Sequence, residues 1–236
     1  MKSNSLVSSN GKHILDDALQ IISYPPEIIP VEKRVDSTAF FPGGIGIYEN
    51  SNTEIDILVL GQDFGTLSYH KALLKGKKVD TNCPTWIHMT ALFNSVSIDL
   101  KNRCFYSNVF MGLRKEDKMT GPLLRIISNS ADRKTYKESC VRFLQNQIKI
   151  IRPKAVITLG NEPIKMLFEA ACKNISSWKR STKATDSNSI VKAIFGDFEC
   201  YCLALLHPSL RHSNLHYRKS TKSEDELLSE LLKLIQ

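Results

Sequence analysis

Long apolar runs are missing from this sequence of 236 residues, and no segment is long enough to serve as a membrane span. Residues 1–12 hold an early lysine followed mainly by serine and asparagine, without the apolar stretch of a secretory signal. We therefore expect a soluble, cytoplasmic protein without a targeting signal or a membrane partner.

Cysteine is sparse and shows no pairing pattern. The six cysteines are scattered, form no C-x-x-C pair, and none precedes position 83. This distribution favours reduced core thiols over a disulfide framework or a metal site, and we expect no cofactor. An internal repeat is absent as well, which argues against a solenoid.

Acidic residues are outnumbered by basic ones. The chain has 32 Lys and Arg against 24 Asp and Glu, a net charge of +8 and a pI near 9.1. Such an excess suits a polyanion partner, whose phosphates would supply affinity that does not depend on sequence. A lysine-rich but otherwise ordinary surface explains the same numbers equally well.

The apolar residues that are present form short runs. Residues 55–60 and 155–159 are near-continuous apolar runs that end at glycines, as buried strands of a parallel sheet do. Residues 103–110 and 199–206 are two further strand candidates, rich in aromatic and apolar side chains. The sequence therefore predicts four strands in this region of the chain.

Amphipathic segments separate these runs. Thr135-Tyr136-Lys137-Glu138 and Ser223-Glu224-Asp225-Glu226 match the S/T-x-x-E capping box, and apolar residues at helical spacing follow each of them. The alternation of strands and helices predicts an α/β protein. We expect a three-layer α/β/α sandwich with a mainly parallel central sheet of about four strands.

The length allows one large domain or two small ones, and we expect a single domain over residues 1–236. Residues 1–54 are expected to form an irregular lead-in with one helix, because prolines and glycines interrupt residues 24–44. Residues 173–192 are polar and basic, and are predicted to be an exposed insertion or mobile loop.

Polar side chains follow three of the predicted strands. In open parallel sheets ligands gather at the carboxyl ends of the strands, so these residues are the site candidates. Gly61-Gln62-Asp63 follows the first strand, Asn108 lies in the second, and His207 ends the last. Each alone has an ordinary explanation in turn chemistry, a satisfied buried amide or a structural histidine. Their placement at one edge of the sheet carries more weight than any single member.

The same residues resemble the motifs of a known family, the uracil-DNA glycosylase superfamily. Leu60-Gly61-Gln62-Asp63-Phe64-Gly65 is similar to a mixture of that family's G-Q-D-P-Y and G-E-x-P-G motifs. Asn108 in residues 106–110 is similar to the asparagine of its T-N-V strand, and His207-Pro208-Ser209 matches its H-P-S motif. Residues 140–160 resemble the helix and strand that join the motifs in the thermophile-type branch. The resemblance covers about residues 55–215.

The resemblance implies a base excision repair enzyme with DNA as its partner, which flips a nucleotide out of the strand and hydrolyses its N-glycosidic bond. Asp63 would stabilise the sugar cation or orient and activate the attacking water. His207 would donate a hydrogen bond to the departing base. A donor placed in this way typically raises the reaction rate about 100- to 1000-fold. Asn108 would read uracil, because an amide can both donate to a carbonyl and accept from the ring N–H.

Other members of the site follow from the same resemblance. A stacking aromatic is expected, with Phe64 the first candidate and Tyr69 and Trp86 its rivals. Leu210 and Arg211 fit a wedge that enters the duplex and steadies the phosphates. The remaining substrate contacts are assigned to the backbone and side chains of the two motifs, at Gly61, Gln62, Gly65 and Ser209.

The sequence departs from the family pattern at several positions. Phe64 replaces a proline, and Gly65 replaces the tyrosine that blocks the thymine methyl in one branch, so thymine or a modified pyrimidine becomes an alternative substrate. The thermophile-type branch carries an iron–sulfur cluster on four cysteines. Here only Cys140 is in place and Gly112 stands near the position of another ligand, so no iron–sulfur cluster is expected.

Two other functions remain open from the sequence. One is a non-catalytic nucleic-acid-binding protein that retains the fold, and the other is a nucleoside-type hydrolase. The pairing of Asp63 with His207 favours catalysis, and the basic charge favours a polynucleotide over a small substrate.

Overall fold

Five strands form the central sheet, in the order β3-β2-β5-β7-β6. The computed structural model describes residues 9–31, 40–43, 55–76, 82–98, 103–117, 121–171, 178, 182–187 and 189–236. Four of the five strands are parallel. The parallel strands are β2 (Ile57–Gly61), β3 (Cys104–Asn108), β5 (Ala155–Leu159) and β7 (Phe198–Leu205). The prediction of about four mainly parallel strands is confirmed, and an antiparallel edge strand, β6 (Val191–Phe195), is added to them.

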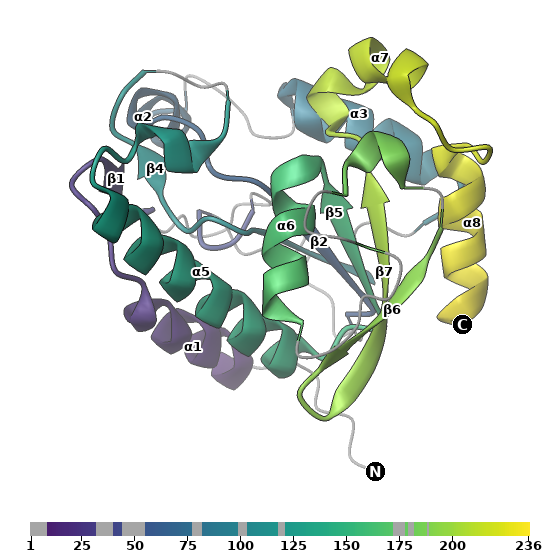
Figure 1. Cartoon of the computed structure of the whole chain (residues 1–236), viewed down its shortest axis with the longest axis horizontal. Helices are drawn as coiled ribbons and strands as arrows, with labels where there is room; N and C mark the ends of the chain where they lie inside the picture. The colour runs from purple at the N-terminus through teal and green to yellow at the C-terminus, as the bar shows by residue number, and fades with distance from the viewer. Residues whose placement is uncertain are drawn as a thin grey trace.

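Helices cover both faces of the sheet (Figure 1). One face carries α1 (Ser9–Ala18), α5 (Ser130–Ile151) and α6 (Asn161–Ala170), and the other carries α3 (Pro84–Ser95) and α8 (Glu224–Leu234). The expected three-layer sandwich is therefore confirmed. Among the described residues, no helix combines the length and apolar character that crossing a membrane requires.

Alternation along the strands explains why the layers form. In β2, Leu58 and Leu60 belong to the core under α5, whereas Ile57 and Val59 belong to the core under α3 and α8. All five residues of β2 are buried, as a strand covered on both faces requires. Each such apolar side chain contributes roughly 1.5–3 kcal/mol on burial.

Short elements line the edge of the sheet at which the parallel strands end. A two-stranded antiparallel ribbon of β1 (Ile28–Ile29) and β4 (Leu113–Arg114) lies beside α2 (Leu67–Leu74). The other elements of the described residues are single turns: η1 (Leu19–Ile21), η3 (Leu123–Ile126), η4 (Ala184–Asp186), η5 (Pro208–Leu210), α7 (Arg211–Asn214) and η6 (Leu215–Tyr217).

The two predicted helix starts differ in outcome. The capping box of Ser223 and Glu226 is confirmed, since each side chain bonds the other residue's backbone N–H. The start predicted at Thr135 is wrong, because α5 begins at Ser130. The Asn129 side chain accepts hydrogen bonds from the N–H groups of Ala131 and Asp132, at 2.8 and 3.2 Å, and so caps the helix earlier.

The prediction that residues 173–192 form an exposed loop needs correction where the segment is described. Trp178 and Ala184 are buried, residues 184–186 form η4, and the segment ends in the first residues of β6. Residues 173–177, 179–181 and 188 lie outside the described residues. Polar composition misled here because a few apolar side chains are enough to pack a segment onto the sheet.

Candidate active site

A cavity of about 970 Å³ opens at the carboxyl ends of the parallel strands. In Figure 1 the strands β5 and β7 point toward this end of the molecule. The parallel register places Gly61 of β2 directly beside Asn108 of β3, and His207 follows β7 by two residues. The cavity is lined by nearly all the predicted site residues, namely Gly61, Gln62, Asp63, Phe64, Gly65, Asn108, His207, Ser209 and Leu210.

Asp63 is held by three donated hydrogen bonds. Its Oδ1 accepts the backbone N–H of Gly65 at 2.8 Å. Its Oδ2 accepts from Gln62 Nε2 and from an Nη of Arg114, both at 2.7 Å. Arg114 is an ion-pair partner whose side chain is 1% exposed, and that of Asp63 is 6% exposed. The carboxylate is therefore fixed in orientation at the wall of the cavity.

Sequence reasoning missed Arg114. It ends the apolar stretch from Val109 to Leu113 and lies in the two-residue strand β4, which has no periodic pattern to reveal it. A cation at the end of an apolar run was the available signal, because a buried arginine needs an anionic partner. The cavity lining also includes this residue.

The side chain of Asn108 depends on the glycine opposite it. A Cβ at Gly61 would collide with Asn108 Oδ1. Gly61 therefore lets the amide lie close against the backbone of the neighbouring strand, where it lines the cavity while remaining only 4% exposed. The glycine is required by this close approach rather than by its turn conformation.

His207 rests over another glycine. A Cβ at Gly160, whose φ is +89°, would lie 3.2 Å from His207 Cβ. The imidazole Nδ1 is 2.8 Å from Ser209 Oγ. Burial lowers the pKa of His207 below its ordinary value of 6.5, and the nearby negative charge of Asp63 opposes this shift without cancelling it.

A neutral imidazole follows from the lowered pKa. If the Ser209 hydroxyl donates to Nδ1, the single ring proton resides on Nε2, which is then a hydrogen-bond donor. Asp63 and His207 line the same cavity, where Asp63 supplies negative charge and His207 supplies a neutral hydrogen-bond donor. Cleavage of a bond with an anionic leaving group needs both, because positive charge develops on one side of the bond and negative charge on the other.

The three aromatic candidates all line the cavity, in different surroundings. Trp86 is 3% exposed and packs edge-on against Tyr106, with ring centroids 4.8 Å apart, so its faces are largely committed to the core. Phe64 and Tyr69 are partly exposed. A fourth aromatic, Phe40, was not predicted: it lines the cavity beside Gly61 and packs against Trp86 at 5.2 Å.

The two predicted DNA contacts after His207 lie in different environments. Leu210 lines the cavity and is 54% exposed. Arg211 is not part of the lining, and its Nε donates to Glu224 Oε2 at 2.7 Å. Its proposed phosphate contact stays a prediction that competes with this ion pair.

The residues that could hold an iron–sulfur cluster do not fit one. Cys140 is fully buried in the core, and burial raises the pKa of its thiol to about 12, whereas a cluster needs thiolates. A side chain at Gly112 would collide with Ile28 Cγ2, so that position has no room for a ligand. Among the described residues, no three His, Cys, Asp or Glu side chains are grouped to bind a metal ion.

Comparison with known proteins agrees with this geometry. The family model described as uracil DNA glycosylase superfamily matches residues 50–232, which include every strand of the central sheet and every predicted site residue. No curated protein matches the chain. The chain belongs to the uracil DNA glycosylase superfamily, which supports a DNA glycosylase-like function with DNA as the partner.

Proposed function

We propose that this protein is a base excision repair glycosylase that hydrolyses the N-glycosidic bond of uracil, or of a related damaged pyrimidine, flipped out of DNA. The observation that carries the proposal is the meeting of Asp63, Asn108 and His207 in one cavity at the carboxyl edge of the sheet. Family membership supports the same chemistry.

The roles follow from the charges that develop during cleavage. The bond between C1′ and the base nitrogen breaks, and its electron pair leaves with the base. The oxygen of a water molecule bonds to C1′ and gives up one proton, and the base anion takes up one proton from solvent, so the charges balance. Asp63 orients this water and stabilises the cationic sugar. The neutral His207 donates to the base oxygen on which negative charge develops, a contribution of about 100- to 1000-fold.

Recognition of the base is assigned to Asn108. Its amide donates to one uracil carbonyl and accepts from the ring N–H, and cytosine lacks that N–H. Gly61 keeps the amide against β2, so the reading group is fixed before the base arrives. Such preorganisation makes a mispaired donor or acceptor costly, at roughly 1–3 kcal/mol.

The substrate range is proposed to extend beyond uracil. Gly65 has a φ of +76°, a conformation that favours glycine, and it leaves no side chain at this point of the lining. A side chain at position 65 would obstruct a pyrimidine that carries a ring substituent. Glycine at this position removes that obstruction. Phe64 is the proposed stacking residue, because Trp86 is already enclosed by the core.

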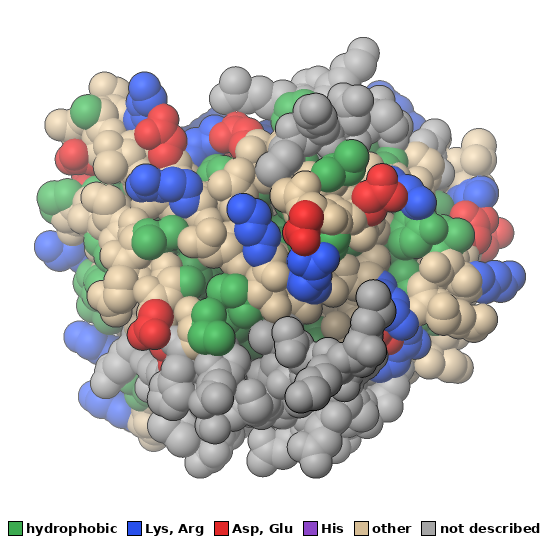
Figure 2. All heavy atoms as spheres, turned by 90° about the horizontal axis from the view of Figure 1, so that it is seen from below, with side chains coloured by type: hydrophobic (Ala, Val, Ile, Leu, Met, Phe, Trp, Pro, Cys, Tyr) green, Lys and Arg blue, Asp and Glu red, His purple; other side chains and the backbone are tan. Residues whose placement is uncertain are grey.

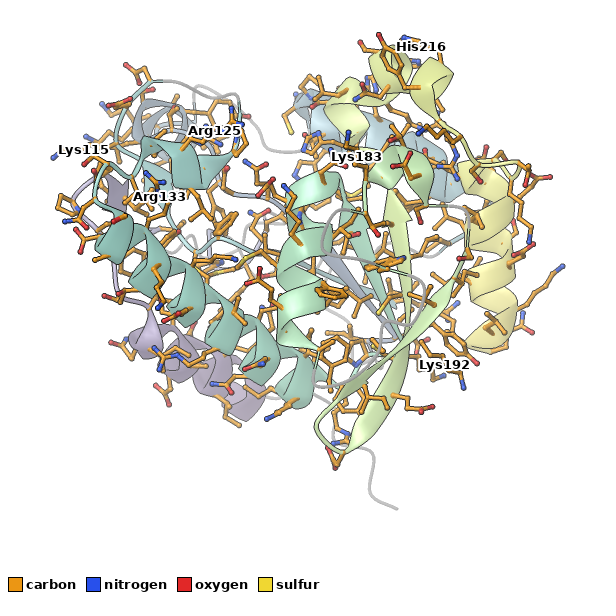
Figure 3. The ribbon with its side chains drawn as sticks, viewed as in Figure 1. Lys115, Arg125, Arg133, Lys183, Lys192 and His216 are labelled. Carbon is orange, nitrogen blue, oxygen red and sulfur yellow. The ribbon has the colours of Figure 1, made fainter. Side chains whose placement is uncertain are left out.

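DNA contact is proposed for the face around the cavity mouth. Lys183 and Lys219 line the cavity and are exposed, and Arg125 lies on η3 near Gly121 and Pro122 of the lining. Figure 3 shows Arg125 and Lys183 on separate elements toward the end to which the strands point. Figure 2 shows a different face of the molecule, seen from below, on which basic and acidic side chains are interspersed among the coloured residues. The exposed Leu210 fits a wedge into the duplex.

The proposal is tested with oligonucleotides that carry U·G, U·A, single-stranded U, T·G or hypoxanthine. Abasic sites are revealed by alkaline cleavage under single-turnover conditions. Release of uracil or a related pyrimidine is expected. Tight DNA binding without release of any base contradicts catalysis and instead favours the non-catalytic DNA-binding protein.

Two substitutions test the assigned residues. Asp63→Asn and His207→Ala are each expected to lower the single-turnover rate by roughly 100-fold or more. Asp197→Asn serves as a control, because Asp197 is an exposed residue paired with Arg152 at the turn between β6 and β7. Wild-type rates in both site variants would remove this assignment.

A further inference from the structure

A closed hydrogen-bond network surrounds Asp63. The Nη group of Arg114 that donates to Asp63 Oδ2 also donates to the Gly121 carbonyl at 2.6 Å. Gln62 Nε2 bonds the same two acceptors, at 2.7 and 3.1 Å. The backbone N–H of Arg114 donates to the Gly65 carbonyl at 2.9 Å, so this one residue binds both the carboxylate and the loop that carries it.

The two carboxylate oxygens differ in remaining capacity. An oxygen of a carboxylate has two lone-pair directions. Two donors occupy Oδ2, whereas among the described residues Oδ1 receives only the Gly65 N–H. Oδ1 therefore retains one acceptor position, and Oδ2 has none to spare.

We propose that Arg114 is a positioning residue that acts through Asp63: it saturates Oδ2 and so makes Oδ1 the oxygen that orients the attacking water. The inference rests on the proposed function. The pairing holds the carboxylate on its Oδ2 side and leaves the acceptor position of Oδ1 for the water. Misplacing such a group by about 1 Å can cost on the order of 100-fold in rate.

Among the described residues, three ionisable groups interact with the carboxylate. Arg114 contacts it directly, and the negative charge of Asp63 acts on both His207 and Tyr136. Burial raises the pKa of Tyr136 well above its usual value, and burial lowers the pKa of His207, so both side chains are neutral near pH 7. Of these three groups, Arg114 is the one that forms an ion pair with the carboxylate.

The first experiment measures melting temperatures of the full chain and needs no substrate. Arg114→Gln leaves a buried carboxylate without its cation, and a loss of roughly 6–20 °C is expected. In the double variant Arg114→Gln, Asp63→Asn neither charge is left unpaired, so it is expected to melt higher than Arg114→Gln alone. The pairing would be overturned if the double variant melts no higher than Arg114→Gln, or if its loss equals the sum of the losses of the two single variants.

The second experiment measures single-turnover rates on the best oligonucleotide substrate. Arg114→Gln is expected to lower the rate about 10- to 100-fold in the wild-type background and less than about twofold in the Asp63→Asn background. Arg114→Lys keeps a charge and one donor, so it is expected to retain more activity than Arg114→Gln. Equal losses in both backgrounds would show that Arg114 does not act through Asp63.

A matched pair provides the control. Arg103 and Asp56 form an ion pair at 2.8 Å at the opposite ends of β2 and β3, away from the cavity. Arg103→Gln is expected to lower the melting temperature slightly and leave the rate unchanged. If Arg114→Gln does not fold, Arg114→Lys, which keeps the charge but loses the planar fork, takes its place in both backgrounds. Equal rate losses in the two backgrounds would overturn the inference.

The two proposals can fail separately. If the wild-type protein is inactive but the double variant melts higher than Arg114→Gln, the proposed function is contradicted and the pairing of Arg114 with Asp63 is supported. An active wild-type protein with additive rate losses contradicts the positioning role alone.

Discussion

The buried carboxylate of Glu224 links the last helix to the loop that carries His207. Glu224 is 1% exposed and lies at the first position of α8. One oxygen accepts the Leu206 N–H at 2.7 Å and contacts Arg218 at 3.3 Å, and the other accepts from Arg211 at 2.7 Å. Replacing Glu224 with Gln keeps an amide oxygen for Leu206 and removes the charge that both arginines share.

The magnitude can be worked from these contacts. A charge pair about 4 Å apart interacts by roughly 4 kcal/mol at an effective dielectric constant near 20, and desolvation offsets part of this. Breaking a buried pair typically costs about 3–5 kcal/mol. In a protein of this size, that corresponds to a melting temperature lower by roughly 6–20 °C.

Thermal denaturation of Glu224→Gln and Glu230→Gln measures the effect. Glu230 pairs with Lys222 near the surface, where both side chains are more than 40% exposed, and such pairs contribute at most about 1 kcal/mol. The Glu224 variant is therefore expected to melt well below the Glu230 variant and to show a lower single-turnover rate. Equal melting temperatures would refute the reasoning, because they would mean that the buried charge does not hold the loop.

Two further predictions concern the cavity. Gly61→Ala is expected to displace the Asn108 amide, since the new Cβ collides with Asn108 Oδ1, and base release measured on the uracil oligonucleotide should fall by roughly 100-fold. Because the folded pKa of His207 is lowered below 6.5, the unfolded chain binds the proton first on acidification, so stability should fall as the pH drops from 6.5 to the lowered value. Melting temperatures across that range should fall less in His207→Gln, and an identical fall in both proteins would contradict the assignment.

The sequence predicted the strand ends well because their signals are local. Gly61, Asn108 and His207 each adjoin or lie within a short apolar run, and the register of a parallel sheet then brings them to one edge. Other residues of the lining, such as Phe64, Gly65 and Ser209, were taken from the family resemblance, and Phe40 and Arg114 were missed. Gly160 was visible as the end of a strand, but its place beneath His207 was not.

The parts that sequence reasoning missed depend on partners far apart in the chain. Arg114 and Asp63 are separated by 51 positions, and no periodicity links an ion pair across that distance. The capping signature at Thr135 failed for a different reason. S/T-x-x-E also occurs inside helices, and only the geometry at Asn129 shows where α5 starts.

The link between Glu224 and the His207 loop also bears on the order in which the site is assembled during synthesis. Asp63 follows β2 and Asn108 ends β3, which are both made early, whereas the group that anchors the His207 loop is made after the loop itself. A growing chain that has not yet added α8 has no acceptor for the Leu206 N–H or counter-charge for Arg211 and Arg218 from Glu224. The half of the site that carries the leaving-group donor thus gains its contacts with Glu224 only after α8 has been made.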